Sequence, residues 1–213
     1  MAQLKESELK KQIKEKAFVP LYFLYGEEKY LISHYTEAIV NKVLGKSYSD
    51  FNFQAFDGGK ASIDEIADAA QALPLFAERK CVLVKDLNVE ALNAGELAKL
   101  YQLLEELSET TVLIISQSTL EIDAKRSAKW KKFIAAAEKN GTVVLLEKRG
   151  EIALEKHRVQ WAEKRGCGLT QINAGKIIQL CGDDLLTLSS ELEKLCAYAA
   201  VSYTHLTLPT ILL

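Results

Sequence analysis

The first segment that could bind a phosphate lies where a strand-like run meets a helix-like one. A working P-loop needs glycines whose backbone N–H groups surround the phosphates, a lysine for the β- and γ-phosphates, and a Ser or Thr for magnesium. Here the segment has only Gly26, followed by the carboxylates Glu27 and Glu28 and then by Lys29. Because carboxylates repel a triphosphate, we predict that no nucleotide binds at this position.

The second half of an ATPase site is also missing. A Walker-B strand ends in acidic residues that hold magnesium, whereas the apolar run 112–116 is followed by Gln117 and itself ends in Ser116. We therefore interpret the chain as a nucleotide-hydrolase scaffold used for another purpose, with no catalytic residue and no cofactor. The alternative is an ATP-dependent enzyme with a degenerate P-loop. Binding of a fluorescent ATP analogue would distinguish such an enzyme from a scaffold without a nucleotide site.

Histidines and cysteines form no recognisable catalytic constellation. His34 falls on the apolar stripe of a predicted helix, which favours a histidine packed in the core over a general base. Cys81, Cys167, Cys181 and Cys196 are widely spaced and form no CxxC pair. We expect reduced, structural thiols and no metal site.

The segment 71–76 joins a predicted helix to a predicted strand and admits two interpretations. Pro74 would end the helix and set an extended turn, so that Leu75 and Phe76 project outward as apolar anchors for a partner. Alternatively, Leu73, Leu75 and Phe76 are core residues, because apolar residues before a strand are often buried. The residue types alone leave these two readings even.

A basic cluster interleaved with Trp130 could contact nucleic acid. Its members are Lys125, Arg126, Lys129, Lys131 and Lys132. They could bind the phosphate backbone of DNA, or they could be the solvated face of a helix whose apolar stripe includes Trp130, which we then expect to point inward. A stand-alone DNA-binding regulator is thus a second alternative, testable by a salt-dependent duplex titration.

The elements that must position these residues follow from the hydrophobic pattern. Short runs at 21–25, 51–56, 81–85, 112–116 and 143–146 are predicted to be strands, and helix-periodic stretches separate them. Several of these runs are continuously apolar, as expected for a parallel sheet covered on both faces. One of these helices begins at a capping box, Ser62 to Glu65. The pattern predicts an α/β fold, a doubly wound parallel sheet, over residues 1–147.

After residue 147 the sequence pattern becomes helical. We expect Lys148-Arg149-Gly150 to be a linker and residues 148–200 to form a small all-helical domain. Its helices are predicted at 157–165, at 174–181 with Asn173 as N-cap, and at 185–200.

Net charge and the lengths of the apolar runs bear on DNA binding and on location in the cell. The 27 basic and 29 acidic side chains give a net charge of −2, so DNA contact would require a local patch. The N-terminus has no apolar segment typical of a secretory signal, and no apolar run is long enough to cross a bilayer. We expect a cytoplasmic protein.

The last residues, 201–213, differ in composition from the rest. Their sequence, VSYTHLTLPTILL, resembles the translation of a transposase mosaic-end adaptor used in sequencing libraries. We exclude them from the fold prediction and expect them to contribute nothing to folding.

Taken in order, three segments resemble the delta subunit of the bacterial DNA polymerase III clamp loader. They are LYFLYGEEKYL at 21–31, QALPLFAERK at 71–80, and GDDLL with ELEKL at 182–195. The resemblance covers residues 20–200. It implies an AAA+-like first domain without a functional ATP site, a helical second domain, and a third, collar domain that we expect beyond residue 200.

The resemblance also implies function and partners. The family binds and opens the ring-shaped sliding clamp (beta) for loading on primed DNA, without hydrolysing ATP itself, as a subunit of the DNA polymerase III holoenzyme. The clamp-binding residues carried over are Gln71, Leu73, Leu75 and Phe76. Further implied partners are the ATP-binding gamma/tau and delta-prime subunits, reached through the collar, and primer–template DNA.

Overall fold

The structure is a computed structural model that describes residues 4–45, 49–123, 126–148, 159–163, 165–182 and 184–201. The chain divides into two compact units, Met1–Glu147 and Lys148–Leu213. Arg149 and Gly150 of the expected linker lie outside the described residues, as do residues 202–213 of the adaptor-like tail.

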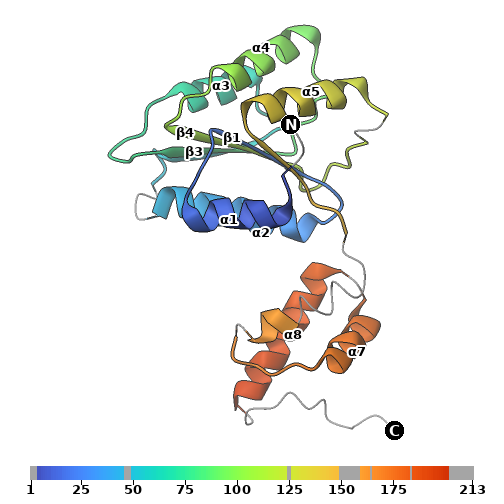
Figure 1. Ribbon diagram of the computed structural model, residues 1–213. Helices are drawn as coiled ribbons and strands as arrows, with labels where there is room; N and C mark the ends of the chain where they lie inside the picture. Colours follow the sequence, from blue (N-terminus) through green and yellow to red (C-terminus); the bar gives the residue numbers. More distant parts are fainter. Residues whose placement is uncertain are drawn as a thin grey trace. The chain divides into compact units, whose positions relative to one another are not determined.

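A five-stranded sheet forms the centre of the first unit (Figure 1). Its strands are β1 (Leu21–Tyr25), β2 (Phe53–Asp57), β3 (Lys80–Lys85), β4 (Thr111–Ser116) and β5 (Thr142–Leu145). They lie in the order β2-β3-β4-β1-β5, and all neighbours pair in parallel. The predicted α/β fold class and parallel sheet are therefore confirmed.

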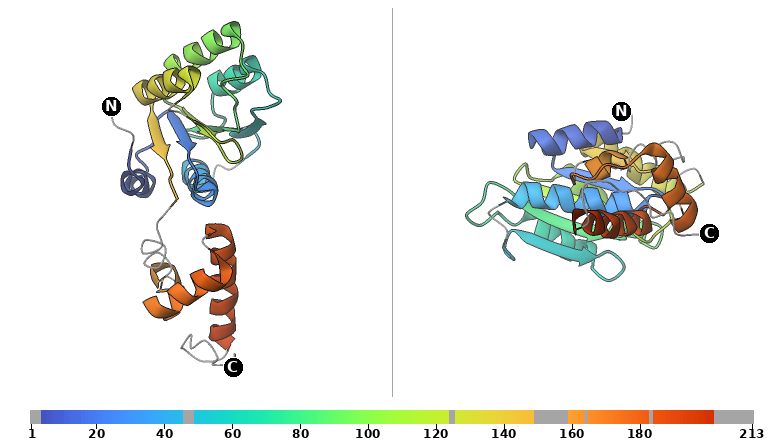
Figure 2. Two further views of the ribbon diagram at one scale, coloured as in Figure 1. Left: turned by 90° about the vertical axis from the view of Figure 1, so that its right-hand side faces the viewer. Right: turned by 90° about the horizontal axis from the view of Figure 1, so that it is seen from below.

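Helices cover both faces of this sheet (Figures 1 and 2). On one face lie α1 (Glu6–Glu15) and α2 (Lys29–Leu44). On the other lie α3 (Ile63–Gln71), α4 (Ala94–Glu105) and α5 (Ala128–Asn140). Burial on both faces explains why β1 and β4 are apolar without alternation: every residue of β1 and of β4 is buried.

Local sequence signals set several of the helix boundaries. The Ser62 hydroxyl accepts a hydrogen bond from the N–H of Glu65, whose carboxylate accepts one from the N–H of Ser62, which confirms the predicted capping box. Helix α1 was missed by the sequence analysis, although Leu9 and Ile13 are four residues apart and both are buried.

The second unit contains α7 (Gln171–Cys181) and α8 (Leu185–Val201), which contact each other. Helix α7 begins three residues earlier than predicted, because the Thr170 hydroxyl accepts the N–H of Asn173 and is the N-cap in place of Asn173. Within the part of the chain that the structure describes, no helix is long and apolar enough to cross a membrane.

Candidate functional site

At the P-loop position, between β1 and α2, the one glycine serves close packing. Gly26 has a φ of +138°, and a Cβ atom there would lie only 2.2 Å from the carbonyl oxygen of Leu146. The same oxygen accepts a 3.0 Å hydrogen bond from the N–H of Glu28, whose side chain is buried. The segment after β5 thus lies against this loop. Its Leu146 carbonyl accepts the N–H of Glu28, a backbone donor that a bound phosphate would need.

Lys29 is held by the loop that follows β4. Its ammonium group donates to the carbonyl oxygens of Leu120, at 2.8 Å, and Gln117, at 3.3 Å. Partial burial lowers the pKa of Lys29, and the carboxylates of Asp86 and Glu121 offset part of this effect. Lys29 occupies the position of a P-loop lysine in the sequence, but its ammonium group is bound to backbone carbonyls of the chain itself.

The strand ends beside this loop carry one acidic residue that the sequence analysis did not consider. Asp86 directly follows β3, and its Oδ1 accepts hydrogen bonds from the N–H groups of Thr119, at 2.7 Å, and Leu120, at 3.3 Å. Gln117, at the end of β4, is fully buried and donates to the carbonyl of Leu87 at 2.8 Å. These groups connect the loops after β3 and β4, and a single acidic residue after an apolar strand is the signal that could have pointed to Asp86.

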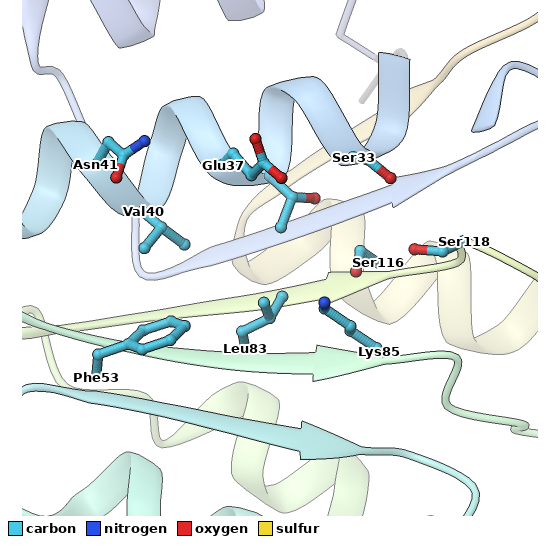
Figure 3. A pocket seen from close by; sticks show the side chains of 10 residues that line it. Ser33, Glu37, Val40, Asn41, Phe53, Leu83, Lys85, Ser116 and Ser118 are labelled. Carbon is cyan, nitrogen blue, oxygen red and sulfur yellow. The ribbon is translucent and has the colours of Figure 1, made fainter. Parts of the chain in front are cut away.

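A polar pocket of about 340 Å³ lies between α2 and strands β3 and β4 (Figure 3). Glu37 and Val40 of α2 face Leu83 and Lys85 of β3 across it. Two lining hydroxyls, Thr36 Oγ1 and Ser116 Oγ, are buried without a hydrogen-bond partner among the described residues. Water or another small polar molecule would satisfy these two groups, and Val40, Phe53 and Leu83 form the apolar part of the lining.

The loop between α3 and β3 presents large apolar side chains to solvent. Gln71, the last residue of α3, is exposed, Leu73 and Leu75 are 78% and 47% exposed, and Phe76 is fully exposed. The interpretation of Leu73, Leu75 and Phe76 as core residues is therefore wrong. An exposed group of this kind on a folded surface is typical of a binding site for a partner.

Asn52 fixes the backbone of this loop, and the sequence analysis missed it. Its side chain is buried and makes two 2.8 Å hydrogen bonds to Leu75: Nδ2 donates to the carbonyl oxygen, and Oδ1 accepts from the N–H. The backbone carbonyl of Asn52 also accepts the N–H of Cys81 at the start of β3, again at 2.8 Å. The three contacts attach the exposed loop to the beginning of the sheet.

Further side chains hold the two ends of the loop. The buried ammonium group of Lys80 donates to the carbonyl of Ala69, and the Thr111 hydroxyl donates to that of Ala70 at 2.7 Å, so both capture free carbonyls at the end of α3. Burial lowers the pKa of Lys80. Arg79 donates to the carbonyl of Phe18 at 2.9 Å. The exposed apolar side chains are thus attached to a backbone that hydrogen bonds within the chain hold in place.

The basic cluster is largely engaged in contacts within the chain. Lys129 donates to the carbonyls of Glu90 and Leu92, each at 2.8 Å, and the Lys132 ammonium lies 4.9 Å from the centre of the Tyr101 ring. Arg126 pairs with Asp123 at 3.4 Å, Lys131 is exposed, and Lys125 lies outside the described residues. Trp130 is buried and stacks on Phe23, which confirms its predicted inward orientation.

His34 was predicted to pack in the core, and this was wrong, since its side chain is exposed and stacks on Tyr30 with ring centres 6.0 Å apart.

The four cysteines are free, and burial raises the pKa of the Cys81 thiol to about 12. No group of three His, Cys, Asp or Glu residues that could hold a metal occurs within the described ranges.

Fold and site together define the class of protein. The parallel sheet in the order β2-β3-β4-β1-β5, with a P-loop position between β1 and α2, is an AAA+-like α/β domain. The chain belongs to the family "DNA polymerase III, delta subunit", whose model matches residues 22–146. The family resemblance found in the sequence is thereby confirmed.

Individual relatives agree with this family. DNA polymerase III subunit delta of Bacillus subtilis (strain 168) is 33% identical over 76 residues, which are 36% of this chain and 22% of the relative. The structure of the Bacillus subtilis DNA clamp loader delta protein superposes with a TM-score of 0.70 at 21% identity, over 94% of this chain and 59% of that one.

Two further structures are, like that one, less than 25% identical and show a likeness of fold alone. A gamma subunit-related protein of DNA polymerase III from Thermotoga maritima superposes with a TM-score of 0.53 at 16% identity, covering 91% of this chain and 61% of that chain. Domain III of the replication initiation protein DnaA from the same organism also gives 0.53, at 15% identity, over 94% of this chain and 85% of that one. The chain spans less than two thirds of the two Bacillus proteins.

Proposed function

We propose that this chain is the part of a clamp-loader delta subunit that binds and opens the ring-shaped sliding clamp, without hydrolysing ATP itself. The observation that carries the proposal is the exposed group Leu73, Leu75 and Phe76, which stands on a loop fixed by Asn52. Family membership supplies the partner, because delta belongs to the clamp loader.

The physical argument is one of exposed anchors with little ordering left to do. Aromatic and aliphatic side chains that enter a pocket on a partner contribute most of the binding energy at an interface. A backbone already held by hydrogen bonds loses less conformational entropy on binding than a free loop does. Gln71 is exposed at the end of α3 and would hydrogen-bond at the edge of the same contact.

The arrangement also supports a function that is independent of nucleotide. In a parallel sheet the loop leading into β3 lies at the amino ends of the strands, whereas the P-loop position after β1 lies at their carboxyl ends. The proposed clamp contact and the P-loop position thus lie at opposite ends of the strands. At that second edge, Lys29 and the N–H of Glu28 already bind to backbone carbonyls.

The deciding experiment is the double substitution Leu75→Ala with Phe76→Ala. Because both side chains are exposed, urea unfolding should give nearly the wild-type free energy of unfolding. Affinity for the purified sliding clamp of the same organism should fall by roughly 2–4 kcal/mol for each anchor that the clamp buries.

A matched control is the double substitution Ile172→Ala with Leu180→Ala, two exposed apolar residues of α7 in the second unit. It should leave clamp affinity unchanged. Wild-type clamp binding by the Leu75/Phe76 variant would refute the proposed function.

Other partners belong to the proposal with less support from the site. The gamma/tau and delta-prime subunits are proposed on family membership alone. Contact with primer–template DNA stays a prediction for the basic cluster of Lys125, Arg126, Lys129, Lys131 and Lys132. Two of these, Lys129 and Lys132, already make contacts within the chain.

A further inference from the structure

The exposed apolar surface of the first unit is larger than the loop between α3 and β3. Among the described residues of Met1–Glu147, the large apolar side chains that are exposed are Phe51, Leu73, Leu75 and Phe76. Phe51 lies outside the segment that resembles the clamp-binding motif, yet it is 72% exposed. The sequence predicted it as the first residue of a strand, whereas β2 begins only at Phe53.

Asn52 joins Phe51 to the other three residues. Phe51 directly precedes Asn52, whose side chain binds the N–H and the carbonyl of Leu75 at 2.8 Å. With one peptide unit and one Asn side chain between them, the Cα atoms of Phe51 and Leu75 lie within roughly 13 Å of each other even at full extension. A surface the size of a protein interface easily covers both positions.

The topology places both segments at the same corner of the sheet. Phe51 comes just before β2, and the Leu73–Phe76 loop comes just before β3, and these two strands pair in parallel from Phe53 with Cys81 onward. Both segments therefore lie at the amino ends of neighbouring strands. Asp50, Gln71 and Glu78 are exposed beside them, which gives the apolar centre the polar surround typical of an interface.

From this arrangement we infer that Phe51 is a further anchor for the sliding clamp, on one contact surface with Leu73, Leu75 and Phe76. This inference rests on the proposed function, since the clamp is the partner named there. Asn52 then has two consequences for the contact: it holds Leu75 in place through its side chain and sets the position of Phe51 through its backbone.

The test compares clamp affinity for Phe51→Ala, for the Leu75→Ala/Phe76→Ala double variant and for the control Leu186→Ala, which removes an exposed apolar side chain of α8. Phe51→Ala should raise the Kd for the purified clamp by about tenfold or more, the loss typical of an interface anchor. Leu186→Ala should leave the Kd unchanged. Urea unfolding of each variant separates a binding loss from a folding loss.

The outcomes distinguish the two claims. If the double variant binds poorly and Phe51→Ala binds like wild type, Phe51 is no anchor while the proposed function stands. If the double variant also binds like wild type, the proposed function fails, and the inference fails with it.

A second measurement uses the unaltered protein and so does not depend on how a variant folds. Hydroxyl-radical footprinting with and without the clamp should show that Phe51 becomes protected in the complex together with Phe76. Full oxidation of Phe51 in a complex that protects Phe76 would overturn the inference.

Discussion

The side chain of Asn52 makes hydrogen bonds to both backbone polar groups of Leu75, in the manner of a strand partner. An amide can do this because it carries a donor and an acceptor side by side. The Asn52 side chain is buried, so it holds the backbone of Leu75 without itself reaching the surface.

Asn52→Ala should therefore weaken clamp binding without removing a contact residue. Two buried hydrogen bonds are lost, and urea unfolding should register a destabilisation of about 1–3 kcal/mol. The Kd for the clamp should rise as well, because the loop must be ordered during binding.

The control is Ile39→Val in α2, a buried position on the opposite face of the sheet. It should cost about 0.5–1.5 kcal/mol of stability while leaving clamp affinity as in wild type. Equal affinity losses in the two variants would mean that Asn52 acts through general stability alone.

Lys29 provides the second prediction at this scale. We expect no magnesium-dependent ATP binding at Gly26–Leu31, because Glu27 and Glu28 stand where phosphates would lie and Lys29 is bound to the Gln117 and Leu120 carbonyls. A fluorescent ATP analogue titrated with and without magnesium checks this. Micromolar affinity that disappears on Lys29→Met would contradict it.

At the scale of the element, α3 connects the capping box to the exposed loop. Its N-terminus is set by Ser62 and Glu65, and its last carbonyls are bound by Lys80 and Thr111. Because the helix is fixed at both ends, Gln71 and the loop after it begin from a defined position. Helix α3 thus connects the local capping signal at Ser62 to the position of the exposed loop.

Ser62→Ala should lower the free energy of unfolding by about 1 kcal/mol, the usual loss when an N-cap hydroxyl is removed. Ser62→Asp is the matched control, since its carboxylate can accept the same N–H and should retain most of the stability. Thermal or urea unfolding of the three proteins measures the difference. Equal stability of Ser62→Ala and wild type would show that the cap contributes nothing.

At the scale of the whole molecule, the proposed clamp contact belongs entirely to the first compact unit. All residues assigned to it, and the hydrogen bonds that hold them, lie within Met1–Glu147. The buried core of that unit is formed by the sheet and the helices on its two faces.

We therefore predict that a fragment ending at Glu147 folds cooperatively and binds the clamp with the affinity of the full chain. Circular dichroism during urea unfolding and a clamp titration test the two parts separately. A fragment that folds but does not bind would place part of the contact in the second unit. The Leu75→Ala/Phe76→Ala change in the same fragment serves as the non-binding control.

The sequence by itself determined the fold class and the strands and helices of the first unit, with the exception of α1. Strands buried on both faces are mostly apolar, so runs such as 21–25 and 112–116 were identifiable, and the Ser62–Glu65 box is a purely local signal. The inward orientation of Trp130 also followed from helical periodicity alone. Family-specific segments such as 21–31 and 71–80 pointed to the clamp loader before any contact was known.

Only the tertiary structure decided which apolar residues remain exposed and what holds them. The exposure of Leu75 and Phe76, the exposure of His34, and the contact of Asn52 with a residue 23 positions away all depend on which segments meet in space. Periodicity reports which side of an element is apolar, but not whether a neighbour covers that side. Burial is a property of the packed molecule, so a site made of uncovered side chains cannot be read from residue types alone.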